Sequence, residues 1–440
     1  MGDFIVVPVE VRCRPTEVNA ADLSKVITTF IRQRNCTTYP GEIIPLHGAS
    51  DLITSNIELL RVCDVYCPIN GVAEGAVDYS LVMYHLHGED EFASRDGGES
   101  LSSGLAAPCD DSDGGGGAPL PLCSTLKLPH ASLEGLWESL HYGESSCDSC
   151  DLKRDLLQYM HAAIIFSMAG VDPHVIAWNQ LLLFHGPPGT GKTSLCKALS
   201  QKLAIRLGEV FTHAALVEVN TQSLFSRWFS ESGKQVMTLF RRIHAMAEDP
   251  NCLLCVLVDE VESLAATRNS ALKGNEPSDA VRVVNTLLTQ LDLLQRRRNV
   301  VILATSNITG AIDVAFIDRA DKKVFIGPPG LQARLELLRR STRELCQRGL
   351  VTLDSFGTEA GTDEQLLLRL GVVARRCESL SGRTLKKLPF LAYSRHVCGT
   401  GGACVAGVSA ARNIPFDTYI NSLTEVLQEE LSMRDAMTLR

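Results

Sequence analysis

The sequence predicts an α/β fold, in which a parallel sheet with helices on both faces carries a phosphate-binding loop. A small α+β domain precedes this part, and a small helical domain follows it. Three near-continuous apolar runs, at residues 181–185, 252–258 and 300–304, alternate with helical patterns, as strands covered on both faces do. Beyond residue 330 the strand signal fades and helical spacing dominates. These observations separate a sheet domain from a helical one.

The N-terminal part has the mixed pattern of a small α+β domain. Residues 5–11 and 79–84 read as strands, and residues 21–34 place apolar side chains on one helical face after Asn19, a residue type that caps helices. Four segments are therefore expected. They are an N-terminal domain at 1–87, an acidic Gly/Ser-rich linker or loop at 88–125, the large sheet domain at 126–326, and the helical domain at 327–440.

The formal charge of -9 belongs mostly to one segment. Between Gly88 and Pro119 there are eight acidic residues and one basic residue, so the rest of the 440-residue chain is close to neutral. Nothing in this balance favours direct nucleic-acid binding. No apolar run reaches the ~20 residues that a bilayer span requires, and the first residues do not resemble a secretory signal. The odd count of 15 cysteines then favours a reducing compartment.

The strongest motif is G-x-x-x-x-G-K-[ST], which lies between an apolar strand and a helical pattern. Its glycines let backbone N–H groups converge on phosphate at a helix N-terminus. Lys192 is placed to contact the β- and γ-phosphates of ATP, and the Thr193 hydroxyl to bind Mg²⁺. The expected ATP-binding residues are Gly186, Pro187, Pro188, Gly189, Thr190, Gly191, Lys192, Thr193, Ser194 and Asp259.

A second motif ends the apolar run at 252–258 with two carboxylates. Asp259 is expected to hold Mg²⁺, partly through water, together with Thr193. Glu260 is expected to act as the general base that polarises the attacking water. An apolar run that ends in Asp-Glu is common by itself, but its position after the phosphate-binding motif identifies it as a Walker B motif.

Three further residues are candidates for the catalytic machinery. Asn307 follows the third apolar run, where its amide can orient the water beside Glu260, although an Asn that closes a turn there is also frequent. Arg319 lies near the end of the sheet domain, and Arg383 opens a helical pattern in the last domain. A guanidinium facing the γ-phosphate can stabilise the transferred charge, whereas a lone arginine is more often a surface ion-pair residue.

Together these motifs resemble those of AAA+ ATPases, and more closely the pachytene checkpoint protein 2 family. The resemblance runs from about Leu126 to the C-terminus and is weaker before it. It rests on these stretches: Gly135 to Leu140, Trp178-Asn179, Gly186 to Leu203, Ser226 to Lys234, Glu276 to Asn285, Ala315 to Asp321 and Leu380 to Phe390.

The resemblance implies an ATP-driven homo-hexamer that converts HORMA-domain proteins, with or without an adaptor, by pulling them through a central pore. It implies roles in meiotic chromosome axis control and spindle-checkpoint silencing, in the nucleus and the cytoplasm, with ATP and Mg²⁺ as cofactors. Asn307 would be sensor 1, Arg383 sensor 2, and Arg319 a finger that acts on the neighbouring subunit's ATP. Many relatives carry two adjacent arginines at that finger, and here Asp318 precedes Arg319.

Trp228 and Phe229 would form the pore loop that contacts the client chain. Large aromatic side chains around a narrow pore can pack against any sequence, and the polar neighbours of this pair argue against burial. Two alternatives stay open. The chain could be a threading ATPase for a different client, of the severing or complex-disassembly type, or a nucleotide-gated scaffold without turnover.

Overall fold

A computed structural model describes most of the chain. The described residues are 5–15, 18–34, 41–63, 77–88, 123–143, 146–172, 175–176, 178–221, 232–263, 278–307, 312, 314–352, 359–396 and 413–438. They divide into two compact units. The first consists of Met1–Glu138, Cys150–Gly186 and Lys192–Phe325, and the second of Ser139–Ser149, Pro187–Gly191 and Ile326–Arg440.

The N-terminal part of the first unit is a four-stranded sheet with the strand order β2-β3-β1-β4. Its central strand β1 pairs antiparallel with β3 and parallel with β4. Helix α1 buries Leu23, Ile27 and Ile31, which lie four residues apart on one helical face, against this sheet. The elements are β1 (Ile5–Cys13), α1 (Ala20–Gln33), β2 (Ile43–Ile44), α2 (Asp51–Asn56), β3 (Ile57–Val62) and β4 (Val77–Tyr84).

The rest of the first unit is built on a six-stranded sheet with the strand order β10-β6-β9-β8-β7-β5. All neighbouring pairs are parallel except β5 with β7, so β5 is an antiparallel edge strand. The strands are β5 (Cys123–Leu128), β6 (Leu181–His185), β7 (His213–Asn220), β8 (Cys252–Asp259), β9 (Val300–Ser306) and β10 (Lys322–Phe325).

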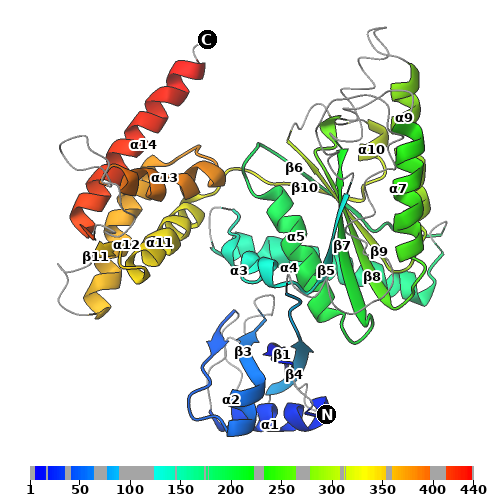
Figure 1. Ribbon diagram of the computed structural model, residues 1–440, viewed down its shortest axis with the longest axis horizontal. Helices are drawn as coiled ribbons and strands as arrows, with labels where there is room; N and C mark the ends of the chain where they lie inside the picture. The colour runs from blue at the N-terminus through cyan, green and yellow to red at the C-terminus, as the bar shows by residue number, and fades with distance from the viewer. Residues whose placement is uncertain are drawn as a thin grey trace, which may run out of the picture. The chain divides into compact units, whose positions relative to one another are not determined.

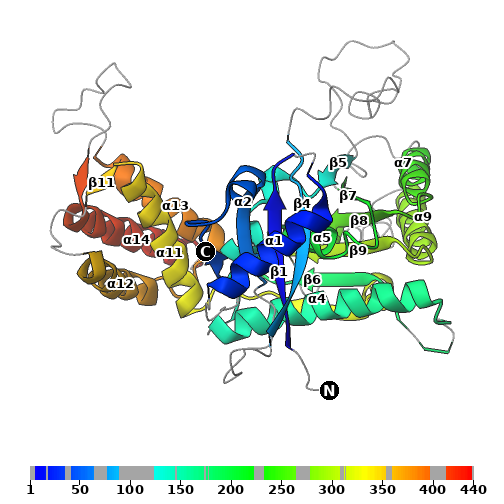
Figure 2. The same ribbon diagram turned by 90° about the horizontal axis from the view of Figure 1, so that it is seen from below.

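Helices cover both faces of this sheet. Figures 1 and 2 show α7 and α9 side by side on one face and α5 on the other. Phe240 of α7 and Leu287 of α9 share one buried cluster with Val256 and Ile302 of the strands. The helices are η2 (Ala131–Leu133), α3 (Leu136–Ser139), α4 (Ser146–Ala169), α5 (Lys192–Arg206), α7 (Ser232–Met246), α9 (Ser278–Gln295) and α10 (Val314–Ile317).

Charged side chains join the N-terminal sheet to helix α5 inside the first unit. The Lys202 ammonium lies 2.5 Å from Glu10 Oε2 of β1 and 2.9 Å from Glu138 Oε1 of α3. Arg61 of β3 completes the cluster with an ion pair of 2.8 Å to Glu138. Glu10 and Lys202 are only 1% and 4% exposed, so this is a buried ion cluster rather than a surface pair.

The second unit contains a helical domain with its own core. Phe416 and Tyr419 of α14 are fully buried and belong to one cluster with Leu370 of α12 and Leu385 of α13. A short parallel pair of strands, β11 and β12, joins the helices. The elements are α11 (Leu331–Gln347), β11 (Val351–Thr352), α12 (Glu359–Arg376), α13 (Gly382–Ser394), β12 (Ile414–Pro415) and α14 (Phe416–Thr438).

The predicted fold class is confirmed: a parallel sheet with helices on both faces, a helical C-terminal domain and a small α+β N-terminal part. Strand β5 begins at Cys123, inside the segment 88–125 that the sequence predicts as a linker or loop. Of the acidic segment itself, only Gly88 belongs to the described residues.

Two further observations concern the environment of the chain. Among the described residues, the helices are all too short or too polar to span a membrane. Eight cysteines of the described part of the chain carry free thiols, and none of these eight forms a disulfide bond.

Candidate functional site

The phosphate-binding loop follows β6 and leads into α5. Gly186, Gly189 and Gly191 adopt φ angles of 144°, 76° and 93°, which side chains rarely allow, so the three glycines are a conformational requirement. The Lys192 side chain is 4% exposed, and its ammonium donates a hydrogen bond of 2.8 Å to the Gly186 carbonyl. The loop thus brings backbone N–H groups and a buried cation to one helix N-terminus, a general site for anions.

The predicted Mg²⁺ ligands lie together at the carboxyl end of the parallel strands. Asp259 is the last residue of β8, and Thr193 is the second residue of α5. The Thr193 hydroxyl lies 3.0 Å from Asp259 Oδ1 and 3.2 Å from Oδ2. Hydroxyl and carboxylate oxygens are the hard donors that Mg²⁺ prefers. The residues present therefore fit this metal.

Glu260 has a left-handed backbone, with φ of 58°. This conformation costs a residue other than glycine about 1–2 kcal/mol, so the surroundings must hold it. The Ser263 hydroxyl donates to the Glu260 carbonyl at 2.8 Å, and the backbone N–H of Val261 donates to the Thr305 carbonyl at 2.9 Å. The turn after β8 is therefore fixed by its own residues and by β9.

Asn307 follows β9 and lies within reach of the same turn. Its backbone N–H donates a hydrogen bond of 3.2 Å to Glu262 Oε1. The other carboxylate oxygen of Glu262 is buried and has no hydrogen-bond partner among the described residues. The structure thus brings Asn307 and the turn that carries Asp259 and Glu260 together, through a glutamate that the sequence motifs did not single out.

The electrostatics around Lys192 suit an anion supplied from outside the protein. Burial lowers the pKa of Lys192 below its usual value of 10.5, and the carboxylates of Glu262 and Asp259 only partly offset this effect. Burial, followed by the charge of Lys192, also lowers the pKa of His185, the last residue of β6. A phosphate group contacting Lys192 would compensate a charge that the protein leaves partly uncompensated.

The loop Pro187–Gly191 belongs to the second unit and contacts the start of α13 there. The backbone N–H of Arg383 donates a hydrogen bond of 3.2 Å to the Gly189 carbonyl. A Cβ atom on Gly189 would lie 2.9 Å from the Ser381 hydroxyl, so the close approach requires glycine. The Tyr142 hydroxyl contacts the Gly191 carbonyl at 3.3 Å. The predicted sensor 2 residue is therefore adjacent to the phosphate-binding loop.

The structure describes the surroundings of the predicted finger residue Arg319 but not those of the predicted pore residues. Arg319 forms a two-pronged ion pair with Asp292 of α9, through Nε at 2.6 Å and Nη2 at 2.9 Å. A role for Arg319 toward a neighbouring subunit stays a prediction. Trp228 and Phe229, the predicted pore loop, lie outside the described residues.

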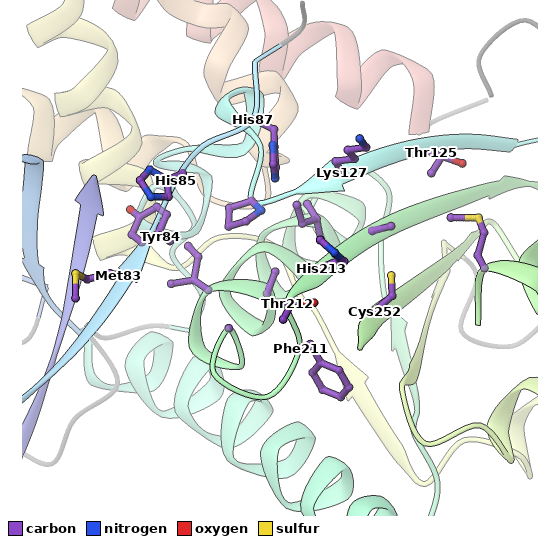
Figure 3. A pocket seen from close by; sticks show the side chains of 18 of the residues that line it. Met83, Tyr84, His85, His87, Thr125, Lys127, Phe211, Thr212, His213 and Cys252 are labelled. Atoms are coloured by element: carbon purple, nitrogen blue, oxygen red, sulfur yellow. The ribbon is translucent and has the colours of Figure 1, made fainter. Parts of the chain in front are cut away.

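A separate cavity of about 950 Å³ lies in the first unit, beside β4, β5 and the amino ends of β7 and β8. Figure 3 shows Tyr84, His85, Lys127, His213 and Cys252 around it. The cavity lies at the amino end of β8, whereas Asp259 lies at the carboxyl end. None of the sequence-predicted residues lines this cavity, so the cavity and the predicted nucleotide site are different places.

Several residues of the site were not singled out by sequence motifs. Thr221 and Thr305 contact the Asp259–Glu260 turn, Glu262 accepts a hydrogen bond from the Asn307 backbone, and Tyr142 contacts the phosphate-binding loop. A signal existed for one of them, because Thr305 directly continues the apolar run that ends at residue 304. The others depend on contacts between segments far apart in the chain.

Comparisons with known proteins match both units. The AAA family, ATPase family associated with various cellular activities, matches residues 182–328, and the TRIP13-like AAA+ ATPase lid C-terminal domain matches residues 354–430. The pachytene checkpoint protein 2 homolog of Oryza sativa subsp. indica is 38% identical, over 98% of this chain and 88% of the relative.

Two further matches are a relative that is similar over part of its length and a solved structure. The Arabidopsis thaliana homolog of pachytene checkpoint protein 2 is 50% identical over 61% of this chain, and the matched part spans 60% of that relative. The solved structure of C. elegans PCH-2 has a TM-score of 0.73 and 30% identity, covering 97% of this chain and 100% of its own.

Proposed function

This chain belongs to the pachytene checkpoint protein 2 family of AAA ATPases, and we propose that it hydrolyses ATP to remodel HORMA-domain proteins. The proposal includes assembly into a homo-hexamer with a central pore, with or without an adaptor that presents the client. It also includes action on meiotic chromosomes and in spindle-checkpoint silencing, in the nucleus and the cytoplasm. The client class, the assembly and the location rest on the family.

The observation that carries the ATPase part is the meeting of α5 and β8 at one point. Lys192 and Thr193 begin the helix, and the Thr193 hydroxyl bonds to Asp259 at the strand end. In this proposal Lys192 binds the β- and γ-phosphates, while Thr193 and Asp259 hold Mg²⁺. When bound, Mg²⁺ draws negative charge from the phosphate oxygens.

The remaining residues act on the attacking water and on the developing charge. The Glu260 carboxylate accepts the proton of this water, and the Asn307 amide orients it. Arg383 contacts nucleotide from the same subunit, and Arg319 does so from the neighbour after it leaves Asp292. Trp228 and Phe229 contact the client in the pore.

The decisive variant is Glu260→Gln, which keeps size and hydrogen bonding but cannot accept a proton. ATP turnover should fall by about 10²- to 10⁴-fold while ATP binding and assembly persist. Glu248→Gln, at an exposed position after α7, is the matched control and should hydrolyse ATP like the unchanged chain. Turnover by Glu260→Gln at the rate of the unchanged chain would show that the general base is another residue.

The client is tested with the same variant as a trap. With ATP bound, it should retain a HORMA-domain protein, identified by mass spectrometry, and a recombinant HORMA-domain protein should stimulate turnover of the unchanged chain. Recovery of tubulin or membrane-coat proteins without any HORMA-domain protein would favour the severing or complex-disassembly alternative. Zero turnover in a correctly assembled hexamer would favour the scaffold.

A further inference from the structure

Two buried threonine hydroxyls contact the peptide group that joins Asp259 to Glu260. One bonds to its carbonyl oxygen and the other to its N–H. Thr305 and Thr221 are only 1% and 2% exposed, and they come from β9 and from the residue after β7, the two strands that flank β8. A buried hydroxyl needs a partner, and both find one in the same short turn.

The Thr305 hydroxyl bridges two groups of this turn. It accepts a hydrogen bond of 3.3 Å from the Glu260 backbone N–H, and it donates one to Asp259 Oδ1. A hydroxyl can donate once and accept at the same time, so both bonds form together. Thr305 therefore ties the direction of the Glu260 peptide to the position of the Asp259 carboxylate.

The Thr221 hydroxyl holds the other side of the turn. It lies 2.7 Å from the Asp259 carbonyl oxygen and 3.3 Å from the Glu260 carbonyl oxygen. Since it has one proton, it donates mainly to the nearer carbonyl. The carbonyl before Glu260 and the N–H of Glu260 belong to one peptide group, and the two threonines thus fix both polar atoms of that group.

We infer that Thr305 and Thr221 are positioning residues for Glu260, an inference that rests on the proposed role of Glu260 in ATP hydrolysis. The left-handed conformation of a glutamate persists only where its surroundings determine it, and these hydroxyls bond both ends of the peptide that precedes it. Without them the peptide can rotate, and the carboxylate leaves the position from which it deprotonates water.

The test compares valine with serine at each position. Thr305→Val and Thr221→Val keep the side-chain shape and remove the hydroxyl, and kcat for ATP should fall by about 10- to 100-fold. Thr305→Ser and Thr221→Ser keep the hydroxyl and should recover kcat to within about threefold, while the Kd of a fluorescent ATP analogue changes by less than about twofold in all four variants. Thr305→Val should in addition require more Mg²⁺, because Asp259 loses one of its two hydroxyl partners and keeps only Thr193.

The matched control is Thr342→Val, which removes a buried hydroxyl in the core of the second unit. Its kcat should equal that of the unchanged chain. Where a valine variant melts below the assay temperature, the alanine variant replaces it and the same criteria apply.

Three results would overturn the inference. They are an unchanged kcat in both valine variants, a loss that serine does not recover, and a loss of nucleotide binding that parallels the loss of kcat. Full activity of Glu260→Gln would instead show that the general base is another residue, which contradicts the proposed role of Glu260 itself. Inactive Glu260→Gln together with fully active valine variants would leave the proposed function intact and remove only the role of the threonines.

Discussion

Helix α5 carries a buried lysine near each end, and the two lysines have opposite electrostatic surroundings. Lys192 and Lys202 are each only 4% exposed. Burial lowers the pKa of Lys192, and nearby carboxylates offset this only in part. Burial also disfavours the charge of Lys202, but Glu10 and Glu138 reverse the effect and raise its pKa. A buried lysine that is compensated by carboxylates is costly to remove alone, whereas a partly compensated one is suited to bind an anion.

The largest expected effect is a loss of ATP turnover without a loss of stability when Lys192, at the start of α5, is replaced. Lys192→Met should reduce ATP turnover by at least about 100-fold, because it removes the cation proposed to bind the phosphates. The melting temperature without nucleotide should stay the same or rise, since methionine needs no hydration. Lys197→Met, on the same helix but partly exposed, is the control for turnover. A lower melting temperature of Lys192→Met would show that Lys192 is compensated after all.

The second prediction is a loss of stability when Lys202, near the end of α5, is replaced. Lys202→Met removes the nearest cation from the buried Glu10, with Arg206 remaining at 3.7 Å, and should lower the free energy of unfolding by about 3–5 kcal/mol in urea titrations. The double variant Glu10→Gln/Lys202→Met removes both charges and should recover most of this loss. If the single and double variants are equally unstable, packing of the lysine stem and not its charge stabilises this end.

The third prediction uses pH to compare the ends within one protein. The pKa of Lys202 is raised in the folded state, so its stabilising contribution is complete below pH 10.5 and is lost as pH rises through its folded-state pKa. The pKa of Lys192 is lowered, so deprotonation there has the opposite sign. Urea titrations between pH 9 and 11.5 should therefore show a steeper alkaline loss for the Lys192→Met variant than for Lys202→Met. Equal slopes would refute the assignment.

The smallest expected effect concerns His185, which precedes the phosphate-binding loop. Its pKa is lowered by burial and by Lys192, so the unfolded chain takes up a proton more readily as pH falls below 6.5. Stability should decrease in that window, and less so in His185→Asn. The difference between melting temperatures at pH 7.5 and 5.5 measures it, and identical differences in both proteins would contradict it.

The sequence predicts the strands well where burial is apolar, and less well where it is polar. Strand β6 has the predicted bounds, and β8 is one residue longer than predicted. Strand β9 continues two residues past its apolar run, because Thr305 and Ser306 are buried through hydrogen bonds rather than through apolar contact. Strand β5 was not predicted, since an edge strand that buries only its first and last residues, Cys123 and Leu128, has a weak signal.

The site also has a part that the sequence predicts and a part that it does not. The glycines, Lys192, Thr193 and Asp259 are encoded in local motifs whose spacing fixes their place on a helix or a strand end. The left-handed backbone of Glu260 is not encoded locally, because it depends on hydroxyls 39 and 45 residues away in the chain. Tertiary contacts of this kind are not visible in a single sequence.

The second unit is built from segments that are far apart in the chain, and this affects when it can fold during synthesis. Its parts come from three stretches of chain, Ser139–Ser149, Pro187–Gly191 and Ile326–Arg440. When the ribosome has passed Phe325, all residues of the first unit exist, yet the loop still lacks its contacts with Ser381 and Arg383. Domains fold as units as they emerge, so a nascent chain completes its nucleotide loop only when α13 has left the exit tunnel. The phosphate-binding loop thus acquires its full set of contacts only after a stretch of chain far downstream of it has been made.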